Sequence, residues 1–299
     1  MLKSLYYIAF LSLITMTSCE KEAQNITYPN FKQKIVLASF ISPNDSISYV
    51  NISSNYPIFG ELNLGKTITI SNAKAYISDG SHEIQLDSSI LGFKFYHKKI
   101  HIEAGKSYII RVEADNGLKA EASCKVPEKQ NFNQKIDTIS ESFTYPDGYM
   151  SSKGFVKIKF TDVSGEANYY IISILKRTYL TCVRYDSTGL HVKKEKCKDE
   201  YYLQFKNNLF NDLGKESQEI EITSETQHGY WKDPNADSAF ITFYLLNINK
   251  DFYKYQQSLN NYTDNADPFT EVSPAYSNVI GGLGIFAGYT KDSVVFRLK

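Results

Sequence analysis

The sequence has no excess of either charge. Its 33 lysines and arginines are matched by 33 aspartates and glutamates, so the formal net charge at pH 7 is zero. A chain without a basic excess does not attract the nucleic-acid backbone, and we therefore expect no nucleic-acid partner. Internal repeats and low-complexity segments are also absent, which excludes a solenoid and a repeat-built linker.

Long hydrophobic runs are missing beyond residue 19, and a transmembrane helix needs roughly 20 apolar residues. The apolar stretch Leu5–Ile14 follows Lys3 and leads to the small-residue site Met16–Cys19. This pattern resembles a bacterial lipobox. It predicts a lipoprotein signal peptide over residues 1–18, fatty acids such as palmitate on Cys19, and a flexible polar tether over residues 19–30. The alternative is an ordinary signal peptide in which Cys19 has no special role.

Cysteine is scarce, with four residues in the chain. Cys182 and Cys197 flank a turn-like run, and the midpoint between them falls next to Gly189. Cross-strand neighbours in one hairpin lie close enough for a disulfide, which an oxidising compartment permits. The alternative is two free thiols. Cys124 has no evident partner, and we expect it to be a buried small hydrophobe.

The familiar catalytic and metal-binding patterns are absent. No Gly-x-Ser-x-Gly elbow, His-Glu-x-x-His or Cys–His pattern occurs. On a strand, His97 and His101 would lie roughly 13 Å apart, too far for one metal ion. We expect no catalytic residue, metal or cofactor. A carboxylate pair for hydrolysis is not visible in a sequence, because its separation depends on the fold.

The run Gly281-Gly282-Leu283-Gly284 is similar to a phosphate-binding loop only in its glycines. A dinucleotide-binding loop opens a helix, whereas these glycines lead into the strand-like residues Ile285–Ala287. We expect a structural role, in which the backbone bends or passes close to another segment.

Aromatic residues are abundant, with 23 tyrosines and 18 phenylalanines, and the short extended runs favour β-structure. About seven strand-length runs separated by turn signals lie between residues 31 and 127. This spacing is typical of an immunoglobulin-like β-sandwich. The polar stretch after Pro127 predicts a domain boundary, with a second β-rich domain over residues 128–299.

The second domain is expected to contain several longer strands and one helix. Phe155–Phe160 alternates between apolar and charged residues, and Ala239–Asn247 is apolar on both sides, as in a central strand. The helix is predicted near residues 250–262 from the spacing of its apolar residues, with Asn249 or Asp251 as its cap. Two closing strands are expected at Leu283–Tyr289 and Ser293–Leu298.

The aromatic pair Tyr230 and Trp231 lies in a polar loop and contains the only tryptophan. An exposed pair of this kind stacks on a sugar or a peptide, which makes it a candidate ligand contact. The alternative is a loop anchor packed on the sheet.

The C-terminal segments Asp267–Phe269, Tyr276–Val279 and Gly281–Ala287 resemble the closing signature of a lipoprotein family of Bacteroidota, domain of unknown function 4249. Residues 72–79, 105–108 and 117–127 are similar to the family's N-terminal sandwich. The resemblance implies an outer-membrane lipoprotein on the periplasmic face or the cell surface, encoded beside TonB-dependent receptors. No catalytic or ligand residue is implied by it.

These observations predict a non-enzymatic, lipid-anchored accessory or ligand-capture partner of a TonB-dependent receptor. The alternatives are a surface adhesin or a glycan- or peptide-binding protein that works without a transporter and, less favoured, a hydrolase.

Overall fold

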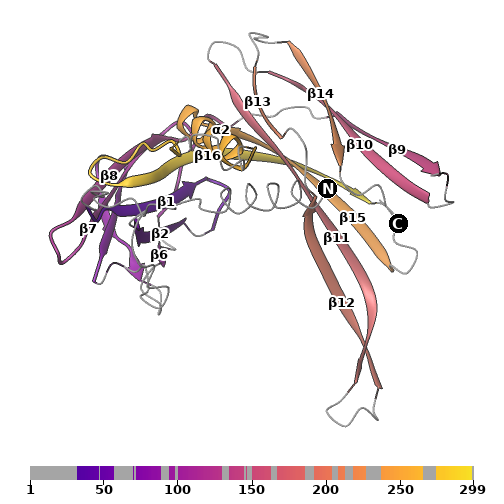
Figure 1. Cartoon of the computed structure of the whole chain (residues 1–299), viewed down its shortest axis with the longest axis horizontal. Helices are drawn as coiled ribbons and strands as arrows, with labels where there is room; N and C mark the ends of the chain where they lie inside the picture. Colours follow the sequence, from indigo (N-terminus) through magenta and orange to yellow (C-terminus); the bar gives the residue numbers. More distant parts are fainter. Residues whose placement is uncertain are drawn as a thin grey trace, which may run out of the picture. The chain divides into compact units, whose positions relative to one another are not determined.

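The computed structural model describes residues 32–46, 48–56, 70, 72–88, 94–97, 100–129, 135–144, 146, 150–162, 167–185, 192–203, 208–212, 218–226, 237–264 and 274–297. They form mainly β-structure, which confirms the expected fold class, with one helix in the described part (Figure 1). All the strands below belong to one compact unit, Gln33–Asn55 and Lys66–Lys299. The predicted signal peptide, Cys19, Tyr230 and Trp231 lie outside the described residues.

Eight strands near the N-terminus form the first sandwich. They are β1 (Ile35–Ile41), β2 (Ser48–Ser54), β3 (Lys74–Ser78), β4 (Glu83–Gln85), β5 (Asp87–Ser88), β6 (Lys94–His97), β7 (Ser107–Glu113) and β8 (Lys119–Lys125). One layer has the order β1-β2-β6-β5, and the other has the order β4-β3-β7-β8. These orders match the ABED and CFG sheets of immunoglobulin domains, with β4 as an added edge strand. The expected immunoglobulin-like sandwich is therefore confirmed.

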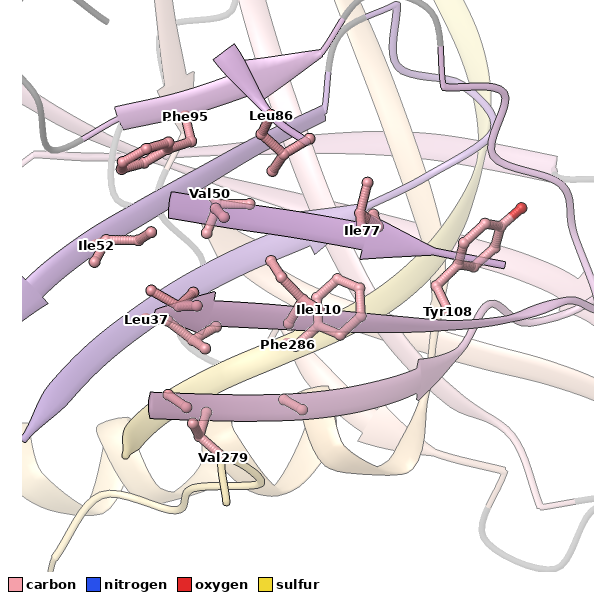
Figure 2. Packing of buried hydrophobic residues seen from close by; sticks show 14 of the residues in the cluster. Leu37, Val50, Ile52, Ile77, Leu86, Phe95, Tyr108, Ile110, Val279 and Phe286 are labelled. Carbon is pink, nitrogen blue, oxygen red and sulfur yellow. The ribbon is translucent and has the colours of Figure 1, made fainter. Parts of the chain in front are cut away.

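The core of this sandwich follows from the alternation of apolar residues along its strands. In β1 every second residue is buried, and β8 shows the same period. Figure 2 shows Leu37 of β1 and Ile110 of β7 among the side chains between the layers. Two residues from the far end of the chain, Val279 and Phe286, belong to the same core.

Tyr108 fixes the corner that leads into β7. Its ring is buried, and its hydroxyl accepts a hydrogen bond of 2.8 Å from the backbone N–H of Glu103 and donates one of 3.4 Å to the carbonyl of His101. This is the tyrosine corner of immunoglobulin-like domains, which lies at the start of the equivalent strand.

The last strand, β16 (Leu283–Arg297), joins the first sandwich to the rest of the chain. Its first half, Leu283–Gly288, pairs in parallel with Val36–Ile41 of β1. Its second half, Tyr289–Arg297, pairs antiparallel with β15 (Ser238–Ile248). In Figure 1 this yellow strand lies beside β1 and then beside β15. Two separate closing strands were predicted, and that prediction is wrong, because the chain changes its pairing partner here without a turn.

The second β-rich part has two layers. Its remaining strands are β9 (Lys135–Thr144), β10 (Met150–Thr161), β11 (Tyr169–Tyr185), β12 (Val192–Leu203), β13 (Leu209–Asn211) and β14 (Glu219–Thr226). One layer is the sheet β14-β10-β9, and the other continues the long sheet in the order β12-β11-β15-β16. Apolar residues of the two layers share one core, including Phe160 of β10, Tyr170 of β11 and Phe243 of β15.

The predicted helix is present as α2 (Lys250–Asp264). Asn249 caps it, because its side-chain oxygen accepts a hydrogen bond of 3.0 Å from the N–H of Phe252. Phe252 packs on the sheet, with its ring centroid 4.6 Å from that of Phe40 in β1. It shares a small core with Ile285 and Ala287 of β16, so α2 covers the face of β16 opposite Phe286.

The predicted boundary after residue 127 stays a prediction. The described strand pairings nevertheless link the parts on its two sides, because β16 is shared between β1 and β15.

Candidate functional site

Cys182 and Cys197 are joined by a disulfide bond between β11 and β12, with their Cα atoms 5.8 Å apart. They are not directly opposed, because Cys197 pairs with Leu180 and Cys182 with Glu195. The expected disulfide is therefore present, and it runs diagonally across the hairpin rather than between directly opposed residues. The turn around Gly189 lies outside the described residues.

The disulfide lies where the hairpin needs support. The pairing of β11 with β15 ends at Tyr179 and Ser238, but its pairing with β12 continues to Tyr185. The part beyond Tyr179 is thus two-stranded within the described chain, and isolated two-stranded hairpins are marginally stable in water. A covalent link at Cys182 holds this projecting part together.

One face of β12 carries a basic stripe, Lys194, Lys196 and Lys198, all exposed. Strand β12 pairs only with β11 in the part of the chain that the structure describes. Lysines on an edge strand discourage the addition of another strand. A partner would therefore contact the side chains of this stripe, and acidic groups would complement them. Lys196 is already paired with Asp237 at 2.6 Å, and Lys198 with Glu200 at 2.8 Å, so a partner would compete with these two acids.

Two tyrosines follow the stripe on β12. Tyr202 is 65% exposed, and Tyr201 is 38% exposed with the Lys176 ammonium 5.6 Å from its ring centroid. An exposed tyrosine offers a large contact area with little loss of side-chain entropy. We define the docking face as Lys194, Lys196, Lys198 and Tyr202. This face was not predicted from the sequence, although adjacent tyrosines in a strand must face opposite sides of the sheet.

The glycine motif has the structural role expected of it. Gly284 has φ +108°, and a Cβ there would lie 1.9 Å from the carbonyl oxygen of Leu37. A Cβ on Gly282 would lie 2.6 Å from the carbonyl oxygen of Ile35. These glycines let β16 lie directly against the backbone of β1, and they lead into a strand.

The residues before the glycines tie α2 to β16. The Tyr276 hydroxyl donates a hydrogen bond of 2.6 Å to Asp251, and the Tyr276 N–H donates one of 2.9 Å to the Ser258 hydroxyl. Burial, followed by the hydrogen bond to Asp251, raises the pKa of Tyr276 to about 12. Asn278 forms hydrogen bonds with the backbone of Phe286. This part of the family-like signature is therefore explained by packing.

No group of three or more His, Cys, Asp or Glu side chains within the described residues could hold a metal ion. In the same residues, no helix has the length and apolar character needed to cross a membrane. Cys124 is buried in the first core, as expected, and burial raises the pKa of its thiol.

Comparisons with known proteins identify a family. A family model described as "Domain of unknown function (DUF4249)" matches residues 21–294. No curated protein matches the sequence. A solved structure titled "Biofilm associated protein - BSP domain" aligns with 92% of this chain at 8% identity and a TM-score of 0.18, a similarity too low to support an argument. The chain spans 61% of the length of that structure.

Proposed function

We propose that this chain, which belongs to the DUF4249 family, is a non-enzymatic outer-membrane lipoprotein that acts as an accessory or ligand-capture partner of a TonB-dependent receptor. The observation that carries the proposal is the N-terminal pattern of Lys3, Leu5–Ile14 and Met16–Cys19. In this proposal the signal peptide is removed before Cys19, and two or more fatty acids on Cys19 give a stable anchor.

Because of the anchor, weak contacts between this protein and a receptor would be sufficient for association. A protein confined to a thin layer beside its receptor meets it at a high effective concentration, so a small docking surface is enough for association. The docking face on β12 supports this proposal, because it combines three exposed lysines with the exposed ring of Tyr202. An acidic segment of the receptor is the partner surface that it would complement.

Two measurements test the proposal. Mass spectrometry of the full-length gene product is expected to show a chain that begins at Cys19 and carries acyl groups. Affinity purification from detergent-solubilised membranes is expected to recover a TonB-dependent receptor. A matched pair of variants places the contact: K194E/K198E is expected to reduce recovery of the receptor, whereas K119E, which changes an exposed lysine on β8, is expected to leave it unchanged.

An unmodified Cys19 thiol on a freely soluble product would contradict the anchor. Recovery without any barrel protein would contradict the receptor role. In a deletion strain, loss of attachment with normal nutrient uptake would instead identify an adhesin.

A further inference from the structure

A pocket of about 250 Å³ lies between the end of β8 and the adjoining ends of β11, β15 and α2. The residues of its lining that matter here are Lys125, Asn168, Asn247, Asn249 and Lys250. Pockets for drug-sized ligands measure about 300 to 1,000 Å³. The size of this pocket therefore suits a single small group rather than a large ligand.

The lining has a positive charge. It contains the two lysines and no carboxylate. Neither Lys125 nor Lys250 forms an ion pair with another residue in the described part of the chain. The closest acid in the sequence, Asp251, does not line the pocket, and its carboxylate accepts the hydrogen bond from the Tyr276 hydroxyl.

The first turn of α2 adds to this positive field. Lys250 is the first residue of this 15-residue helix, and its cap, Asn249, lies in the pocket wall. The N-terminus of a helix has a positive partial charge and free backbone N–H groups, both of which favour an anion.

Asn247 is the residue that points to a ligand. It is only 2% exposed, yet its side-chain amide forms no hydrogen bond within the described part of the chain. It lies between Tyr170 of β11 and Thr290 of β16, two residues after the core residue Leu245. Among the described residues, the side-chain atoms that are fully buried without a hydrogen-bond partner belong to Arg111 and Asp162, so the Asn247 amide keeps access to solvent and is available to a ligand. Asn247 lines the pocket, and a side-chain amide can donate a hydrogen bond to an oxygen atom bound there.

We infer that this pocket binds a small oxyanion, either a carboxylate or a phosphate group, through the Asn247 amide and the charges of Lys125 and Lys250. The inference goes beyond the proposed function, because it requires neither the lipid anchor nor a receptor. Asn168 contributes to the wall, where its backbone N–H donates a hydrogen bond of 2.9 Å to Asp212 and holds the end of β11 in place.

Calorimetric titration of the full chain in detergent tests the site with three probes: inorganic phosphate, acetate and neutral glucose. Saturable binding of phosphate or acetate, and none of glucose, is expected. Binding of phosphate alone would identify a phosphorylated ligand, and binding of acetate alone a carboxylate ligand. Because the attraction depends on charge, the affinity is expected to fall as the chloride concentration rises.

Three variants decide whether the binding occurs in this pocket. N247L keeps the number and branching of the side-chain heavy atoms but removes the amide, and K250Q removes one charge at an exposed position; each is expected to weaken binding about tenfold or more. K74Q changes an exposed lysine of β3 and is expected to bind like the parent chain.

The inference is overturned if neither anion binds saturably, or if K250Q and N247L both bind as tightly as K74Q. The anion-binding experiment and the receptor experiment can fail independently, because recovery of a receptor by affinity purification does not require an anion in the pocket.

Discussion

Asn278 is hydrogen-bonded twice to the backbone of Phe286. Its side-chain amide donates a bond of 2.8 Å to the carbonyl oxygen, and its side-chain oxygen accepts one of 3.0 Å from the N–H. Phe286 lies in the half of β16 that pairs with β1, and its side chain is fully buried in the first core. An asparagine side chain reproduces the donor and acceptor of a neighbouring strand, and no other side chain of this size except glutamine has both groups.

We predict that N278D destabilises the protein by about 2 kcal/mol, because the carboxylate has no donor for the Phe286 carbonyl and leaves it unpaired. Chemical denaturation of the purified chain measures the free energy of unfolding. N51A, at an exposed position of β2, is the control and is expected to change stability by less than about 0.5 kcal/mol. Equal stability of N278D and the parent would show that the two bonds contribute nothing.

A methyl group at Gly284 is expected to be far more costly than one at Gly117. Both glycines have a positive φ, but a Cβ at Gly284 meets the carbonyl oxygen of Leu37, whereas nothing lies within 4 Å of a Cβ at Gly117. We predict a loss of about 1 kcal/mol for G117A from backbone strain alone. For G284A we predict about 3 kcal/mol or more, because β1 and β16 must separate. Similar losses in the two variants would mean that the close approach is unimportant.

The stability of the protein is expected to fall above pH 10. Burial and the hydrogen bond to Asp251 raise the pKa of Tyr276 to about 12, so the native state favours the neutral phenol. This contribution is complete below the unfolded pKa of about 10 and is lost as the pH rises toward 12. Burial and a hydrogen bond to Asp45 raise the pKa of Tyr289 in the same direction.

The effect is measured from chemical-denaturation midpoints at pH values between about 8 and 12. This range extends about two units to either side of the unfolded phenol pKa of about 10. Y276F is expected to show a shallower decline than the parent, with a remainder from Tyr289. Identical curves for Y276F and the parent would refute the assignment to Tyr276.

The four cysteines are expected to differ in their reactivity toward a thiol reagent. Cys124 is buried, and the desolvation of its thiol raises its pKa, so we predict almost no reaction with a thiol reagent in the native state. Under the proposal that Cys19 is acylated, unfolding without a reductant is expected to expose one reactive thiol per chain, that of Cys124. Added reductant is expected to expose two more, Cys182 and Cys197. A second thiol before reduction would mean that Cys19 is not acylated.

The sequence was informative where structure depends on local patterns. Alternating apolar residues and turn signals identified the immunoglobulin-like sandwich, and the spacing of apolar residues identified α2 within two residues of its end. The glycine motif was interpreted correctly because a phosphate-binding loop requires a following helix, and here a strand follows.

Pairing across long distances in the chain was not predictable in the same way. The sequence of β16 contains Thr290-Lys291-Asp292, which is typical of a turn, but the strand continues because β15 replaces β1 as its partner. The pocket around Asn247 was missed for a related reason. The predicted strand Ala239–Asn247 indicated a central position, but only the fold shows that Lys125 and Lys250 lie beside its end.

The shared strand also sets the order in which the protein can fold. Val36 pairs with Leu283 and Ile41 with Gly288, so β1 cannot complete its pairing until β16 has been synthesised. Until then β1 has an open edge, which is a site for aggregation in a partly folded chain. Contacts of such long sequence separation also slow folding. A chain truncated before residue 283 would lose the shared strand from both of its sandwiches.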